Sequence, residues 1–275
     1  MSGTAPSHIT AITIDNPPVN ALSRTVVDTL TAQVAEANAD PAVTAIVIIG
    51  KGRGFIAGAD ITNFLRVIEH GDPMIELSPM LAVIENCSKP VIAAIHGHAL
   101  GGGLETVMAC HYRVAVPDAK MGQPEVNLGL IPGAGGTQRL PRLVGIEKAA
   151  EMCALGAPVT ATEAHALGII DQVIEGDLLA GALAFAATVA NQPPRRTCDR
   201  NQRLSSTDLS VLRAQVHRHA QLAAIDAVQA AGKLPFEEGL RYERKLFLEC
   251  LHSEEAKQMI AEFFASRASK KPTSH

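Results

Sequence analysis

Two glutamates and two glycine-containing loops are the residues of this chain whose types and spacing can do chemistry. The stretch GHALGGGLE, residues 97–105, places three consecutive glycines between an apolar run and Glu105. Consecutive glycines cost backbone entropy on folding, so a local feature should require them. FIAGAD, residues 55–60, is a second glycine-containing loop that follows an apolar run. The second acid, Glu125, lies in GQPE, where Pro124 stiffens the approach to it.

The glycines favour a site for a negatively charged oxygen over a site for phosphate. A dinucleotide site needs GxGxxG directly after the first strand of a βαβ unit, and neither GHALGGG nor GAGGTQ (133–138) fits that pattern. The GGG sequence stands instead between an expected strand and an expected helix, whose first N–H groups have no intrahelical partner. Paired N–H donors from two such loops can stabilise an enolate or a tetrahedral oxyanion. On these residues alone, a purely structural role in tight turns stays open.

The two glutamates supply the context for such a site. Glu105 lies just inside the helix that the glycines open, so it can face the same cavity as their N–H groups. Two carboxylates near an oxyanion site can divide the acid and base roles between them. Taken alone, either glutamate is more often solvated or salt-bridged. No His, Cys and Asp cluster has metal-ligand spacing, so we expect no metal.

Strands and helices that position these residues can be read from the hydrophobic pattern. Short apolar runs and alternation predict strands over 8–15, 44–50, 89–97, 112–117 and 169–174. Helical spacing predicts helices over 26–40, 80–86, 104–111, 147–156, 161–168 and 178–192. Residues 62–80 are expected to be loop, and 122–145 mostly loop with short helical pieces. Strand–strand–helix units recur, so we predict an α/β protein.

The composition shifts near residues 195–206, where we place a boundary. From about residue 207 onward the pattern is almost entirely helical and rich in charge. We therefore predict a core over 1–200 that carries the site, a C-terminal helical region over 201–270 and a disordered tail over 271–275.

Composition and charge exclude several classes of protein. The 275 residues are 47% hydrophobic and 19% charged, as in a globular protein with a large core. The formal net charge of −4 argues against nucleic acid as the main partner. No signal peptide or membrane-spanning apolar run is found. The five cysteines are scattered and include no CxxC, which favours a reduced, cytoplasmic protein.

Three segments together resemble the enoyl-CoA hydratase/isomerase superfamily, which has the crotonase fold. They are GRGFIAGADI (52–61), KPVIAAIHGHALGGGLE (89–105) and MGQPEVNLGLIPGAGGTQRLPRLVG (121–145). Their order and spacing match as well as their residues. The resemblance looks closest to the hydratase half of multifunctional β-oxidation enzymes. It implies a crotonase-like spiral of ββα units with a C-terminal helical region that forms homotrimers or hexamers, and either a stand-alone hydratase or one domain of a longer protein.

The resemblance also implies roles for particular residues. Glu105 and Glu125 match the catalytic glutamates, and the N–H groups of Ala59 and Gly102 match the oxyanion hole. Further residues match the positions that bind the acyl-CoA substrate: Ala57, Gly58, Asp60, Ile61, Gly101, Pro124 and Gly133. For Asp60, a loop-capping role competes with a contact to the CoA adenosine end.

Retention of both acids favours hydration of a trans-2-enoyl-CoA to a 3-hydroxyacyl-CoA, with no cofactor beyond the CoA of the substrate. Two alternatives remain open. One is a Δ3-Δ2-enoyl-CoA isomerase, because isomerases of the family generally need only the equivalent of Glu125. The other is a non-catalytic acyl-CoA-binding or RNA-binding member of the same fold. The two acids weigh against a binding module, and the acidic net charge weighs against RNA.

Overall fold

A computed structural model describes residues 8–268, and the tail predicted over 271–275 lies outside them. The main sheet has five parallel strands in the order β1-β2-β3-β5-β8. These strands are β1 (His8–Ile14), β2 (Val43–Gly50), β3 (Val91–Ile95), β5 (Tyr112–Ala115) and β8 (Gln172–Val173). A smaller sheet has the order β4-β6-β7, made of His98–Leu100, Lys120–Gly122 and Val159–Thr160. The predicted α/β class is confirmed.

The chain is built of successive ββα units, each of which forms one turn of a spiral. Strands β3 and β5 each lead into a short strand of the second sheet, β4 and β6, before the chain turns helical. In the first two turns, isolated bridges replace those short strands and join Leu22 to Ala59 and Ile56 to Ala99. The glycine loops therefore lie where each turn crosses from the large sheet to its helix. The glycine loop after β2 is stacked directly on the glycine loop after β3.

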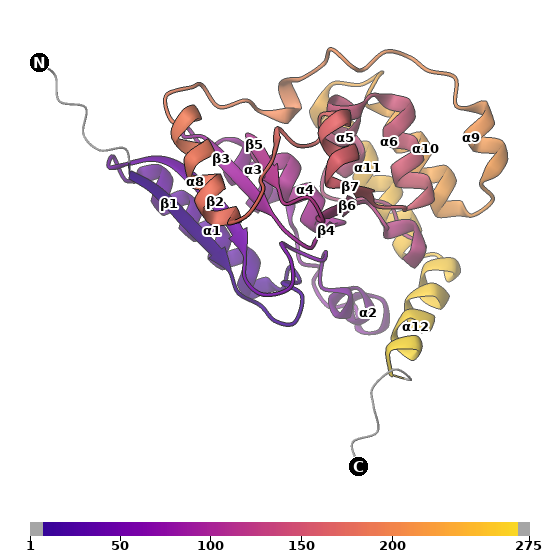
Figure 1. Cartoon of the computed structure of the whole chain (residues 1–275). Coiled ribbons are helices and arrows are strands. Elements are labelled where there is room, and N and C mark those ends of the chain that lie inside the picture. Colours follow the sequence, from indigo (N-terminus) through magenta and orange to yellow (C-terminus); the bar gives the residue numbers. More distant parts are fainter. Residues whose placement is uncertain (1–7, 269–275) are drawn as a thin grey trace, which may run out of the picture.

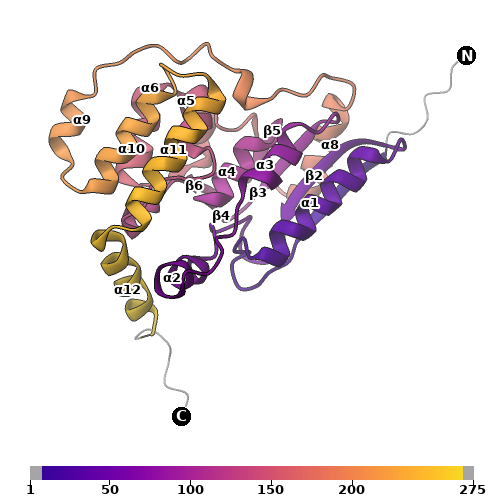
Figure 2. The same cartoon turned by 180° about the vertical axis from the view of Figure 1, so that it is seen from behind.

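Helices cover both faces of the main sheet, as Figures 1 and 2 show from opposite sides. Alternate residues of β2 point to opposite faces, with Val47 toward α8 and Ile46 and Ile48 toward the larger core. Burial on both faces explains why β2 and β3 are almost continuous apolar runs. The helices up to this point are α1 (Arg24–Ala39), α2 (Ile61–His70), α3 (Ser78–Glu85), α4 (Gly102–Ala109), α5 (Gly136–Val144), α6 (Ile146–Leu155), α7 (Ala161–Leu167) and α8 (Leu178–Val189).

The C-terminal helices pack over the second half of the core. They are α9 (Ser210–Gln215), α10 (His219–Ala230), α11 (Phe236–Leu251) and α12 (Glu254–Ala268). Helix α10 packs on α5 and α6, α11 packs on α5, and α12 lies beside α2 in both views (Figures 1 and 2). The boundary predicted near 195–206 falls in the connection between α8 and α9, which contains one short 3-10 helix, η2 (Thr197–Asp199). The division into domains stays a prediction.

Helix α2 and the short strands β4, β6 and β7 were not predicted from the sequence. The predicted loop over 62–80 contains most of α2 and the start of α3. Helix α2 begins after Asp60, whose carboxylate accepts the N–H of Thr62, and it ends at Gly71 in the left-handed conformation. Its cap and its apolar residues at helical spacing are a signal that the sequence does carry. The three-residue strand β4 gives no such signal, because it is too short for a period to be read.

Helix α4 packs against the backbone at Ile56 at a distance that only glycine permits. A Cβ atom at Gly103 would overlap the carbonyl oxygen of Ile56 and lie 2.9 Å from its carbonyl carbon. The same strand pair holds the glycine loops together through the Ile56–Ala99 bridge. Gly103 is therefore a packing requirement of the fold.

Replacing this glycine tests the packing. Alanine at a helical position normally favours the helix by about 1 kcal/mol, whereas overpacking costs about 1–3 kcal/mol. We expect Gly103→Ala to lower the free energy of unfolding in urea by about 1 kcal/mol or more. Gly232→Ala is the control, because its nearest neighbour would be an ordinary 3.5 Å away. A Gly103→Ala variant as stable as the wild type would contradict the packing argument.

Candidate active site

The residue before α4 brings the backbone close to one of the two acids. Gly101 has φ 53° and ψ −125°, a conformation in the left-handed half of the map that glycine adopts without strain. Its N–H donates to the carbonyl of Gly122 at 2.9 Å. A Cβ atom at Gly101 would lie 2.8 Å from Glu125 Oε1. The first glycine is therefore needed both for the turn and for the approach of this carboxylate.

The backbones of Ala59 and Gly102 are in contact beside this turn. Gly102 is the first residue of α4, so its N–H has no intrahelical acceptor. A Cβ atom at Gly102 would lie 3.4 Å from the nitrogen of Ala59, so the two loops are in contact. The neighbouring bridge uses the N–H of Leu22 and the carbonyl of Gly58, at 2.9 Å. Within residues 8–268, neither the Ala59 nor the Gly102 N–H donates to a loop or strand carbonyl.

Glu105 projects from the first turn of α4 and is 2% exposed. Its Oε1 atom accepts two hydrogen bonds, from the N–H of Ala134 and from the N–H of Gly136, each at 2.8 Å. Burial raises the pKa of the Glu105 carboxyl, while these two bonds and the nearby Arg139 partly oppose that rise. Both hydrogen bonds end on the same oxygen, so the carboxylate is anchored at one side.

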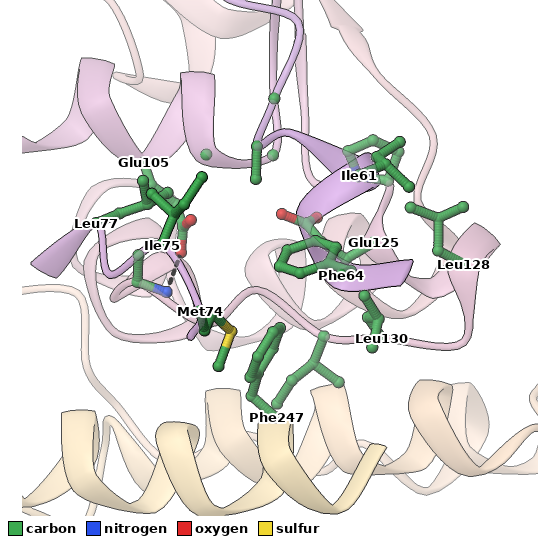
Figure 3. Close-up of a pocket in the computed structure, with 18 of the residues that line it drawn as sticks. Ile61, Phe64, Met74, Ile75, Leu77, Glu105, Glu125, Leu128, Leu130 and Phe247 are labelled. Atoms are coloured by element: carbon green, nitrogen blue, oxygen red, sulfur yellow. Dashed lines mark hydrogen bonds between the residues drawn. The ribbon is translucent and has the colours of Figure 1, made fainter. Parts of the chain in front are cut away.

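Glu125 begins the 3-10 helix η1 (Glu125–Leu128) and is half-buried. With the amide of Gln123 oriented to donate, its nitrogen lies 3.0 Å from Glu125 Oε1 and 3.2 Å from Oε2. Burial and then the neighbouring charge of Glu105 raise the pKa of the Glu125 carboxyl well above its ordinary value. Figure 3 shows the carboxyl groups of Glu105 and Glu125 facing each other across the pocket.

One pocket joins the two acids and the two N–H groups. It encloses about 740 Å³ of empty space, part of which is open to solvent. The predicted site residues that line it are Ala57, Gly58, Ala59, Ile61, Gly101, Gly102, Glu105, Pro124, Glu125 and Gly133. Asp60 does not line the pocket. Its side chain caps α2, so the structure supports the loop-capping reading, and its role in substrate binding stays a prediction.

The opposite wall of the pocket is mostly apolar (Figure 3). It is formed by side chains from α2, the loop after α2, the end of η1, the segment after η1, and α11. These are Phe64, Met74, Ile75, Leu77, Leu128, Leu130, Ile131 and Phe247. Arg244 of α11 also lines the pocket, and it donates to Glu76 Oε1 at 2.5 Å. The C-terminal helical region therefore supplies part of the pocket.

Several polar residues around the site were not identified from the sequence. Glu243 of α11 is 1% exposed and accepts the N–H of Gly135 at 2.6 Å and of Thr137 at 2.8 Å. Arg139 is paired with Glu85 at 2.7 Å and donates to the carbonyl of Ala134 at 3.0 Å. Glu243 carries a readable signal, because it lies on the buried face of α11 four residues from both Gly239 and Phe247. A charged residue on such a face usually has a buried partner.

Among the described residues, no group of three or more His, Cys, Asp or Glu side chains is arranged to hold a metal ion. No helix between residues 8 and 268 is long and apolar enough to cross a membrane. The expectations that the protein needs no metal or other cofactor and is cytoplasmic stay predictions.

The sequence and the fold are those of a known family. A family model described as enoyl-CoA hydratase/isomerase matches residues 4–245, and the chain belongs to this family. The chain is 39% identical to the probable enoyl-CoA hydratase of Bacillus subtilis (strain 168), with 94% of this chain and 93% of that protein covered. The resemblance read from the sequence is thereby confirmed.

Other relatives are longer than this chain. It is 41% identical to the peroxisomal bifunctional enzyme of Danio rerio, over 96% of this chain but only 38% of that enzyme. Among solved structures, it resembles an enoyl-CoA hydratase/isomerase from Pseudoalteromonas atlantica T6c. The TM-score is 0.69, the sequences are 28% identical, and 93% of each chain is covered. The predicted crotonase-like fold is thereby confirmed.

The buried carboxyl of Glu243 gives a prediction about stability and pH. Burial, and next the charge of Glu105, raise its pKa from an ordinary 4.5 to about 8. Between these two values the folded protein holds a proton that the unfolded chain releases, so raising the pH withdraws stability from the wild type. The charged groups that interact with Glu243 are Glu105, Glu125 and Arg139.

We expect the unfolding free energy of the wild type to fall relative to that of Glu243→Gln as the pH rises from about 5 to about 8. Urea unfolding of both proteins across this range measures the difference. Glu249→Gln removes an exposed carboxylate from the same helix and should leave the difference from the wild type independent of pH. Parallel pH profiles for the wild type and Glu243→Gln would show that Glu243 does not hold the proton.

Proposed function

We propose that this protein is an enoyl-CoA hydratase, which adds water across the C2=C3 bond of a trans-2-enoyl-CoA to give a 3-hydroxyacyl-CoA. One observation carries the proposal. A buried and a half-buried carboxyl group, both with raised pKa values, face each other in a pocket that is also lined by Ala59 and Gly102, whose backbones are in contact. Paired N–H donors suit a thioester oxygen that becomes an enolate, and paired acids suit the addition of water next to it.

In the proposed mechanism the thioester oxygen accepts hydrogen bonds from the N–H groups of Ala59 and Gly102. These bonds strengthen as negative charge develops on that oxygen, so they lower the barrier to attack at C3. Glu105 and Glu125 hold the attacking water between them. As the water oxygen bonds to C3 and the C2=C3 π bond breaks, Glu105 accepts a proton from the water and Glu125, whose pKa is raised the more, delivers its own proton to Cα. Transfer of a proton from Glu105 to Glu125 then restores both groups. The apolar wall around Phe64 and Leu130 suits the hydrocarbon part of the substrate.

The alternatives differ in what they ask of the two acids. An isomerase moves a proton between C2 and C4 of one enolate, and a single carboxyl group suffices for that. The family as a whole is described by both activities, hydratase and isomerase. A protein that only bound acyl-CoA or RNA would have no use for two buried acids at a cost in stability. We also propose that the protein assembles as a homotrimer or a hexamer, which light scattering can test.

Hydration depends on both carboxyl groups. We expect Glu105→Ala and Glu125→Ala each to lower kcat by at least about 100-fold, the usual scale for general acid–base groups. The assay offers crotonyl-CoA and a longer 2-enoyl-CoA and follows the loss of absorbance of the conjugated thioester. Unchanged turnover in both variants would sink the assignment.

Isomerisation should separate the two acids. With a 3-enoyl-CoA as substrate, we expect Glu125→Ala to abolish formation of the conjugated product and Glu105→Ala to reduce it much less, because one carboxyl group can carry the proton. Following the rise in absorbance of the conjugated thioester measures this. If a wild type without hydratase activity converted the 3-enoyl-CoA, the isomerase alternative would replace the hydratase proposal.

A further inference from the structure

The loop over 133–137 is held from two sides by two different carboxylates. The N–H groups of Ala134 and Gly136 donate to Glu105 Oε1, each at 2.8 Å. The N–H groups of Gly135 and Thr137 donate to Glu243, at 2.6 Å and 2.8 Å. Four successive amides thus alternate between the two acids. Because the peptide planes are linked, fixing one pair of amides also fixes the direction of the other pair.

Glu243 is bound to this loop by more than the two amides. The hydroxyl of Thr137 donates to Glu243 Oε2 at 2.6 Å, and it accepts a hydrogen bond from Gln138 Nε2 at 2.9 Å. Since a hydroxyl has one hydrogen to donate, the bond from Gln138 directs that hydrogen to Glu243. The carboxylate therefore has three donors, with both of its oxygens engaged and its side chain buried on α11.

The loop has little freedom to adjust if this hold is lost. Gly135 has φ 97°, and a Cβ atom there would overlap the guanidinium of Arg139. The same guanidinium donates to the carbonyl of Ala134 and is paired with the buried Glu85. The peptide between Ala134 and Gly135 is thus fixed through its oxygen by Arg139 and through its nitrogen by Glu243.

We propose that Glu243 is a positioning residue for Glu105. From outside the pocket it fixes the loop over 133–137, so that the N–H groups of Ala134 and Gly136 anchor one oxygen of Glu105 and leave Oε2 for the reacting water. Glu243 does not line the pocket. The role rests on the proposed hydratase function, and it ties the C-terminal helical region to the chemistry.

A double-mutant cycle in kcat distinguishes positioning from simple support of the fold. Gln is close to Glu in shape, but its NH₂ group would face an N–H donor of the loop. In an assay above the Glu243 pKa of about 8, where the wild-type group is a carboxylate, we expect Glu243→Gln to lower kcat about 10- to 100-fold, the scale of a misplaced catalytic group, and to change KM less. In a Glu105→Gln background, Glu243→Gln should cost less than about 2-fold more, because the residue through which it acts is gone.

The controls make the cycle decisive. Glu249→Gln, at an exposed position of the same helix, should keep the wild-type kcat. Loss of kcat that multiplies in the double variant, or a Glu243→Gln enzyme with wild-type kcat, would overturn the proposal. If Glu243→Gln does not fold, Thr137→Val removes one of the three donors to Glu243 with little change in shape. It should then show a smaller loss that likewise vanishes in the Glu105→Gln background.

A measurement without substrate separates this proposal from the proposed function. The amide signals of Ala134 and Gly136 in the ¹⁵N-labelled full chain report their hydrogen bonds to Glu105. We expect both to move toward the positions of unbonded amides in Glu243→Gln and to stay in place in Glu249→Gln. Unmoved signals would overturn the positioning role even if the enzyme hydrates enoyl-CoA. Moved signals in a protein without hydratase activity would support it while the proposed function failed.

Discussion

Buried negative charge beside one short loop is the constraint on which the rest of the site depends. The charge of Glu105 raises the pKa of both Glu125 and Glu243, and the charge of Glu243 also raises that of Glu125. An isolated buried carboxylate is costly, so each must find donors or keep its proton. Arg139 is the nearest cation, but its charge is already matched by Glu85. Backbone N–H groups therefore provide most of the compensation for Glu105 and Glu243, and burial raises the pKa of all three acids.

The glycines follow from this constraint. A carboxylate can accept backbone N–H groups only if it comes within hydrogen-bond distance of the main chain. A Cβ atom at Gly101 would be 2.8 Å from Glu125 Oε1, and one at Gly136 would be 2.9 Å from Glu105 Oε1. Glycine is thus required on both sides of the pocket where an acid meets the backbone. Glycine is required at Gly103 for a different reason, the close packing of α4, which serves the fold and not the chemistry.

Much of the fold and part of the site could be predicted from the sequence. Strands β2 and β3 are almost continuous apolar runs because both their faces are buried, and such runs can be recognised in the sequence. Glu105 and Glu125 could be paired because each follows a marked turn and because the motifs resemble a family. The bond between Glu243 and the loop could not be found in this way, since the two segments are more than 100 residues apart. Local periodicity places a residue on a face of its own helix but does not say which distant amides that face will meet.

The two facing acids have unequal surroundings, which suit them to the different roles proposed for them. Glu105 receives two backbone N–H groups and the field of Arg139, all of which favour its charged form. Glu125 has the charges of Glu105 and Glu243 against it. The pKa of Glu125 is therefore raised further than that of Glu105, which suits Glu125 as the proposed proton donor and Glu105 as the proposed acceptor. Environments that push two pKa values apart separate an acid from a base. Glu243 contributes to this separation twice, because it orients the donors to Glu105 and opposes the ionisation of Glu125.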